Sequence, residues 1–462
     1  MKPKTLRLAI IGCFAPLALM AAPAFADLSS DLKAEIEAQR ALLEAQQAQL
    51  AAQRSRLEAL ERKLDAATAP QAAAAPPAPP QQSAQAKSPS ATLVASADWE
   101  PGFTFQVTPA DIVTLYGLID ATISDISNAN AAGAHKRSYQ TAWFSGNRWG
   151  ITGKHELEGG GMSTIFKLES EYDYQDGSMD TPNVLFNRDS WVGFQSEALG
   201  KLTFGRQNAL ARDYTSIYGD AFSGAKVTLE EGGYSNVNNF KQLIYYAASA
   251  TGTRYDRGLV WKKEFGPFVA GLGYQFGGIV GAYQKGSTQT AAFGFNAPGD
   301  AFHLAGFYNH FNVNGLVHKA YSVGGNVAIG PMVRLNSGYY KYDSEQGGGV
   351  GNRKDHAYTI SAKVAPGPHF EYDLGYQLIH ADNAGVNGSG FVLTPYADAS
   401  GVTRAVMGNK KTLYGAMFYH FDRRAEVYLA ADYMKLTEGY KLAVTNGHDS
   451  QTEVGVGMRI RF

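Results

Sequence analysis

The sequence predicts an all-β fold, a transmembrane barrel of 16 antiparallel strands, preceded by an α-helical coiled coil and a linker rich in Pro and Ala. Three observations predict it. Between residues 111 and 462, polar and apolar residues alternate over stretches of about ten residues or more, the length of a tilted membrane-spanning strand. Short turns alternate with longer polar segments along the same region. The chain of 462 residues also holds 51 Gly and 26 Tyr, which favours strands and turns over helices.

Charge and cysteine content exclude several classes of function. Lys plus Arg number 41 against 42 for Asp plus Glu, so no net basic field exists to hold the phosphates of a nucleic acid. The single cysteine, Cys13, lies near the start of the chain. It leaves the rest without a disulfide framework, a Cys-ligated zinc site or a cysteine nucleophile. We expect no nucleic-acid partner, no cofactor and no metal.

Residues 1–26 are predicted to be a cleaved export signal. A basic start precedes an apolar run over residues 8–22, and the small residues of Ala-Phe-Ala at 24–26 form the cleavage site. The alternative, a lipoprotein cleavage site at Cys13, would leave only about five apolar residues before the cysteine. No apolar run of about 18 residues remains after cleavage, so the mature chain is either soluble and exported or a barrel.

Residues 27–66 are predicted to form a helix that associates in parallel with other copies. Apolar residues recur in a heptad pattern, although glutamines occupy the middle of the second seam row, and such a seam needs partner chains. The seam residues are Leu32, Ile36, Leu43, Leu50, Leu57, Leu60 and Leu64. The heptads leave open whether two or three chains associate. A single amphipathic helix lying on another domain is the alternative.

Residues 67–110 are predicted to be a linker, because prolines recur there among Ala, Gln and Ser. Such a composition favours extended polyproline II at about 3.1 Å per residue and a semi-rigid spacer without a core. The helix before it would be about 55 Å long at 1.5 Å per residue. Residues 27–110 could therefore reach into the periplasm and bind peptidoglycan, which is a hypothesis.

Turn positions determine the strand count of the predicted barrel at residues 111–462. A first division, which includes residues 239–249 as a strand, gives an odd number, whereas bacterial barrels usually close with an even number. Moving residues 239–249 into the preceding loop leaves 16 strands, with every tight turn on one side and every long loop on the other. Both termini then lie on the short-turn side, the periplasm.

The first and last predicted strands each have one apolar and one polar face. On the first strand Leu115 and Ile123 share one face, whereas Asp120 and Thr122 share the other. The last strand alternates in the same way as far as the terminal Phe462. A soluble sandwich also alternates, but its strands are usually only about five or six residues long.

One predicted loop, residues 207–252, is unusually long. Loops above about 15 residues are generally functional or disordered. Because a barrel of 16 strands can enclose an aqueous channel, we expect this loop to fold inward and narrow it. An outward surface loop is the alternative. Its candidate acidic residues are Asp213, Asp220, Glu230 and Glu231.

Four segments resemble successive signatures of the trimeric general porins of Gram-negative outer membranes, especially the β-proteobacterial branch. They are VTLYGLID at 113–120, NRWGITG at 147–153, FNRDSWVG at 186–193 and TFGR at 203–206. Phe462 also fits, because a C-terminal aromatic residue in that family is part of the signal read by the outer-membrane assembly machinery. The resemblance implies a homotrimer surrounded by outer-membrane lipid and lipopolysaccharide. The N-terminal extension departs from the ordinary pattern and resembles those of certain sugar- and dicarboxylate-selective porins.

The resemblance also implies a cluster of arginines on one wall of the pore constriction, facing acidic groups on the third loop. Arg148 and Arg188 match the wall arginines motif by motif, and Arg254 is a weaker match. Independently, alternation places Arg148 on the same polar face as Thr152. The facing acids are expected among the four loop carboxylates, but the sequence does not indicate which of them face the arginines. A surface salt bridge near the rim is the alternative for each arginine.

The predicted function is a water-filled outer-membrane channel for passive diffusion of small hydrophilic solutes and ions. The alternative is a substrate-selective porin for sugars or organic acids such as dicarboxylates. The abundance of Tyr does not separate the two, because Tyr also forms the girdles at both membrane interfaces. We expect no enzyme and no catalytic residue, because the ten histidines lie in no recognisable Ser or Asp constellation. An energy-coupled receptor would need a plug domain, which residues 27–110 cannot form.

Overall fold

The computed structural model describes one large unit of the chain, Lys87–Phe462, separately from Met1–Ala86. The described residues are 37, 93–95 and 102–462, with gaps at 142, 223–225, 234–247, 278–286, 314, 348, 388–401 and 443–446. The predicted export signal, the coiled-coil seam and most of the predicted linker lie outside these residues.

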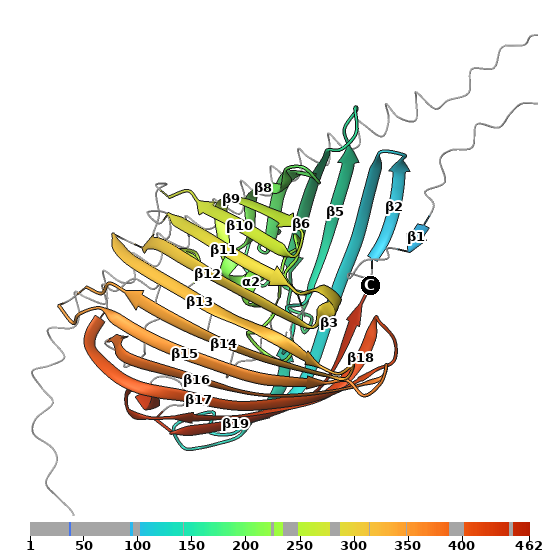
Figure 1. The fold of residues 1–462 in the computed structure, drawn as a ribbon. Coiled ribbons are helices and arrows are strands. Elements are labelled where there is room, and N and C mark those ends of the chain that lie inside the picture. The colour runs from blue at the N-terminus through green and yellow to red at the C-terminus, as the bar shows by residue number, and fades with distance from the viewer. Residues whose placement is uncertain are drawn as a thin grey trace, which may run out of the picture. The chain divides into compact units, whose positions relative to one another are not determined.

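Strands make up most of the described chain (Figure 1). They are β1 (Leu93–Ala95), β2 (Gly102–Thr108), β3 (Asp111–Ile126), β4 (Lys136–Thr141), β5 (Arg148–Glu156), β6 (Ser163–Glu171), β7 (Asp189–Ser196), β8 (Gly200–Asn208), β9 (Arg254–Phe265), β10 (Phe268–Gln275), β11 (Thr288–Asn296), β12 (Phe302–Val313), β13 (Leu316–Ile329), β14 (Val333–Ser344), β15 (Arg353–Val364), β16 (Phe370–Asn387), β17 (Val402–His420), β18 (Ala425–Leu436) and β19 (Ser450–Arg461). The helices are α2 (Leu210–Thr215), η1 (Pro298–Asp300) and η3 (Glu438–Leu442). Among the described residues, no helix has both the length and the apolar character needed to cross a membrane.

The strands close into a barrel. β3 and β5–β19, 16 strands in all, pair antiparallel with their neighbours in the chain, and β19 pairs with β3. This confirms the predicted number of strands and their closure. β9 begins at Arg254, and residues 239–247 of the stretch that was moved into the preceding loop lie outside the described residues.

The connections follow the predicted sides, with one exception. Each predicted tight turn joins two strands on the same side of the barrel, from the turn between β5 and β6 to the turn between β17 and β18. On the other side, where only long loops were predicted, β12 ends at Val313 and β13 begins at Leu316. This link is itself a tight turn, and Gly315 supplies its positive φ of 89°. The prediction that all links on this side are long was therefore wrong.

Side chains alternate across the barrel wall as predicted. On the outward face Ile123 is 59% exposed and Val456 is 60% exposed, whereas the inward-facing Asp120 and Thr122 are almost completely buried. An apolar outer surface and a polar interior are the arrangement that a membrane-spanning barrel requires.

β2 lies in the stretch predicted to be linker, so the prediction was wrong for these residues. It pairs with the first half of β3, and the hydroxyl oxygens of Thr104 and Thr114 are 3.0 Å apart. Phe103, Phe105 and Val107 alternate with polar residues, as in a strand. The Pro-rich composition around this short stretch concealed the pattern.

The C-terminal residue lies where β19 and β2 meet on the edge of β3. Gly117 and Phe462 exchange two backbone hydrogen bonds, of 2.8 and 2.9 Å. The ring of Phe462 covers Gly117 and leaves no space there for a Cβ atom. β19 pairs with residues 118–126 of β3 and β2 pairs with residues 111–116, so the two strands share one edge of β3.

The opposite edge of β3 is also shared. β4 pairs with residues 121–126 of β3, and β5 pairs with residues 111–118. The intervening described residues, 143–147, belong to neither strand. Trp143 and Phe144 in this segment are each only 3% exposed and pack in an apolar cluster with side chains of β17 and β18.

Candidate functional site

The connection between β8 and β9, here called the long loop, lies against the inner wall of the barrel. Every residue of α2 in this loop is buried. The hydroxyl of Tyr214 donates to the carbonyl of Val269 on β10, at 3.4 Å. The hydroxyls of Tyr218 and of Ser322 on β13 are 2.8 Å apart. The loop therefore contacts strands other than the two that it connects.

The middle of the long loop reaches the strands beyond β13. The carbonyl of Gly219 accepts a hydrogen bond of 3.0 Å from Gln377 on β16. Phe222 lies with its ring centroid 5.6 Å from that of Tyr414 and 6.0 Å from that of Phe418, both on β17. The described part of the loop thus extends along the interior as far as β17.

Three of the four predicted loop acids pair with lysines of the inner wall. The pairs are Asp213 with Lys262 of β9 at 2.5 Å, Glu230 with Lys201 of β8 at 3.0 Å, and Glu231 with Lys167 of β6 at 2.7 Å. The fourth, Asp220, accepts the N–H of Phe222 at 2.8 Å. Among the described residues, these three loop carboxylates therefore pair with ammonium groups, whereas the resemblance implied guanidinium groups.

The charge of one of these acids is fixed by its partner. Burial by itself would raise the pKa of the Glu231 carboxyl, but the ammonium charge of Lys167 outweighs burial and lowers the pKa to about 2. The indole N–H of Trp191 also donates to this carboxylate, at 3.2 Å. Glu231 therefore remains an anion at neutral and mildly acidic pH.

The predicted wall arginines lie beside acidic residues of the wall itself. Arg188 forms ion pairs with Glu169 through Nε and with Glu171 through Nη1. Arg254 is 3.6 Å from Asp189, between Nε and Oδ1. Arg148 lies opposite Glu171 in the pairing of β5 with β6. Glu171 interacts electrostatically with all three arginines, so the structure brings the predicted arginines together.

These residues are here called the arginine cluster, defined by three cations and three anions of β5, β6, β9, the first residue of β7 and the residue before it. Its members are Arg148, Arg188, Arg254, Glu169, Glu171 and Asp189. Tyr116 of β3 extends it by donating a hydrogen bond of 2.7 Å to Glu169. Positive and negative groups alternate in the cluster. The electric field that they create in the interior therefore depends on where each charge lies more than on their sum.

Sequence reasoning missed the acidic members of the arginine cluster and the three lysines that bind the loop. The signal was present in the period of two along β6, where Lys167, Glu169 and Glu171 share one face and alternate with Phe166 and Leu168. Lys201 and Lys262 lie opposite each other in the pairing of β8 with β9. Alternation could therefore have placed these charges inside the barrel, but not their partners.

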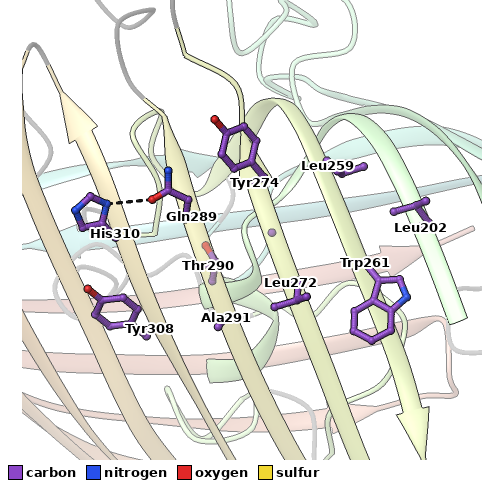
Figure 2. Close-up of a pocket in the computed structure, with 11 residues that line it drawn as sticks. Leu202, Leu259, Trp261, Leu272, Tyr274, Gln289, Thr290, Ala291, Tyr308 and His310 are labelled. Carbon is purple, nitrogen blue, oxygen red and sulfur yellow. Dashed lines mark hydrogen bonds between the residues drawn. The ribbon is translucent and has the colours of Figure 1, made fainter. Parts of the chain in front are cut away.

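A hollow on the other face of the wall is separate from this site. Ala291 lies between Leu272 and Tyr308 in the ladder, and its small side chain leaves space between the larger ones (Figure 2). At one edge Nδ1 of His310 donates to Oε1 of Gln289 at 3.1 Å. Leu272 is 56% exposed, as expected for an outward position. The hollow is thus part of the outer apolar surface.

Comparison with known sequences places most of the chain in one family. A family model described as Gram-negative porin matches residues 66–439. An outer membrane porin protein of Bordetella pertussis is 30% identical over 173 residues, which cover 34% of this chain and 44% of that protein. The chain therefore matches less than half of the length of this relative.

Solved structures share the fold at low sequence identity. An anion-selective porin from Comamonas acidovorans superposes with a TM-score of 0.58 at 21% identity, covering 76% of this chain and 100% of that one. The trimer form of OmpT, an outer membrane protein of Vibrio cholerae, gives a TM-score of 0.54 at 15% identity, covering 76% and 100%. With the closed barrel of 16 strands and the family match over most of its length, the chain belongs to the Gram-negative porin family.

Proposed function

We propose that this protein forms a water-filled channel in the outer membrane of a Gram-negative bacterium, through which small hydrophilic solutes and ions diffuse passively. The observation that carries the proposal is a closed barrel of 16 strands with an apolar outer face and a charged interior. Barrels of this size enclose an aqueous channel. The relative in Bordetella pertussis, named an outer membrane porin protein, supports the location.

The long loop narrows this channel, and the arginine cluster sets its selectivity. The proposal is supported by the buried course of α2 and by the ion pairs that anchor the loop to Lys167, Lys201 and Lys262. Fixed charges facing a pore act on solutes by attraction and repulsion, so no proton transfer or covalent step is involved. Arg148, Arg188 and Arg254 would attract anions, and the neighbouring carboxylates would moderate that preference.

The functional unit is a homotrimer, with the N-terminal extension in the periplasm. A trimer form among the structural neighbours supports this assembly, and so does the resemblance of the strand motifs to trimeric porins. Outer-membrane lipid and lipopolysaccharide would contact the outward face, and Phe462 would be read by the assembly machinery. Binding of residues 27–110 to peptidoglycan is part of the same proposal.

A substrate-selective channel for organic acids is the second candidate function. Arg254 is 7% exposed, and its Nε lies 3.6 Å from Asp189, whereas among the described residues its Nη2 atom has no hydrogen-bond partner. Buried polar groups are usually satisfied, so a carboxylate solute that passes this position would supply the missing acceptor. The same observation favours organic acids over sugars as the selective alternative.

The first test is the single-channel conductance and the reversal potential of purified protein in planar bilayers under a salt gradient. We expect channels that close in three steps, and a shift of selectivity toward cations in Arg148→Ala and Arg188→Ala. The shift should be larger in 0.1 M than in 1 M salt, because the Debye length falls from about 10 Å to about 3 Å. Phe293→Ala, on the outward face, is the matched control.

Each outcome decides one part of the proposal. Absence of conductance would refute the channel. Conducting channels with unchanged selectivity in both arginine variants would refute the role of the arginine cluster. Channels that conduct chloride poorly but are blocked by millimolar succinate would replace general diffusion with the organic-acid alternative.

A further inference from the structure

The segment between β4 and β5, residues 143–147, enters the interior of the barrel and is here called the inner segment. β4 and β5 pair with different halves of β3, so the chain leaves the wall between them. Trp143 and Phe144 are both buried. A strand that is interrupted in this way brings backbone into a space that side chains would otherwise line.

Asp120 of β3 holds the backbone of the inner segment. Its Oδ2 atom accepts the N–H groups of Phe144 and Ser145, both at 2.8 Å. Its Oδ1 atom accepts the hydroxyl of Tyr428 at 2.6 Å. The side-chain carbonyl of Asn147 in turn accepts the N–H of Asp120. Buried backbone donors need such partners, so these bonds fix the course of the segment.

The inner segment also contacts the long loop. The ring centroid of Phe144 lies 4.8 Å from that of Phe222, in the middle of the long loop. The same ring lies 5.1 Å from Phe418 and 4.7 Å from Tyr428, the latter at an interplanar angle of 79°. Phe144 therefore joins the loop to β17 and β18, in distances typical of favourable aromatic pairs.

At its other end the inner segment touches the arginine cluster. A Cβ atom at Gly146 would lie 2.7 Å from Nη1 of Arg188 and would also collide with the carboxylate of Glu171. The backbone of Gly146 therefore lies directly against this ion pair. Ser145 accepts a hydrogen bond of 2.9 Å from Arg459 of β19, so a fourth arginine is held beside the segment.

We propose that the inner segment is a second constriction element, which positions the long loop through Phe144 and the Arg188–Glu171 pair through Gly146. The inference rests on the proposed channel function. It states that these residues determine the width of the channel and the positions of its charges. Phe144 and Gly146 are positioning residues, because they act through the loop and the ion pair.

The first experiment compares single-channel conductance in the full-length protein, Phe144→Ala, Phe222→Ala and the double variant. Each single variant is expected to raise the conductance and the frequency of brief closures, because the loop loses its contact with the far wall. The double variant is expected to change conductance no more than the larger single change, since both remove one contact. Phe293→Ala on the outward face serves as control.

The second experiment tests the contact with the ion pair by measuring the reversal potential. Gly146→Ala should displace Arg188 or Glu171 and change selectivity. Gly367→Ala should leave selectivity unchanged, because nothing lies within 4 Å of a Cβ atom at Gly367.

Folding of each variant is checked by its heat-dependent migration in gel electrophoresis before conductance is measured. If the parent protein conducts while folded Phe144→Ala and Gly146→Ala retain its conductance and selectivity, the inner segment is not a constriction element. Independent, multiplicative effects of Phe144→Ala and Phe222→Ala would also contradict the proposed contact. A parent protein without conductance would instead refute the underlying channel function.

Discussion

Individual lysines determine how the long loop is held at the wall. Lys262 and Asp213 are a buried pair, with side chains 4% and 3% exposed, and Asp213 also accepts a hydrogen bond of 3.1 Å from Asn208. An ion pair removed from water is sensitive to loss of one partner, because the other charge is then left buried without compensation. The position of α2 thus depends on the Lys262–Asp213 pair as well as on the burial of its apolar residues.

Replacing Lys262 alone is expected to destabilise the protein strongly. Lys262→Met should lower the free energy of unfolding by about 3–5 kcal/mol, as for other broken buried pairs. The double variant Lys262→Met/Asp213→Asn should recover part of this loss, because no unpaired charge remains. Urea unfolding in detergent micelles measures the free energy of unfolding of the single and the double variant. Equal stability of the single variant and the parent protein would show that the pair is open to solvent.

Strands and turns could be predicted from the sequence where their formation depends on residues that are close together in the chain. Alternation and turn residues gave the strand number. β2 was missed because a strand of 7 residues inside a Pro-rich stretch gives a weak pattern. The partners of Asp213, Glu230 and Glu231 were not predictable, because they depend on contacts between distant strands.

Removing β2 is expected to weaken the barrel without changing its channel. Cross-strand pairs contribute about 0.2–1 kcal/mol each, so deleting residues 102–108 should cost a few kcal/mol. The first half of β3 would also be left with an unpaired edge. The temperature at which the folded gel band disappears measures the loss, and single-channel conductance should be unchanged. Deletion of residues 76–82 in the predicted linker is the control of equal length and should leave that temperature unaltered.

The whole molecule is organised by the contrast between its two faces. Large apolar side chains are exposed along the outward face, including Leu272, Leu413 and Val456, whereas the buried ion pairs Lys167–Glu231 and Lys262–Asp213 lie in the interior. In water such an exterior would cause aggregation, but in a bilayer it is the solvated surface.

An outward charge is expected to disrupt membrane insertion. Val456 lies in the middle of β19, opposite Ile123 of β3. Val456→Arg should destabilise the inserted barrel by about 2–4 kcal/mol if this position is near the midplane of the bilayer. Folding into lipid vesicles at increasing urea concentrations measures the change. Val456→Leu is the control, and equal folding of the arginine variant and the parent protein would mean that this face is not exposed to lipid.

The shared edge of β3 has a consequence for how the barrel is completed. β2 and β3 are adjacent in sequence and can pair early, whereas β19 is separated from β3 by the rest of the barrel and pairs with it only after a long loop of chain has closed. A final strand that slid along β3 beyond Gly117 would meet β2 already in place. A slip of one residue would turn every side chain of β19 to the wrong face. By blocking further movement of β19 along β3, β2 would fix the register in which the barrel closes.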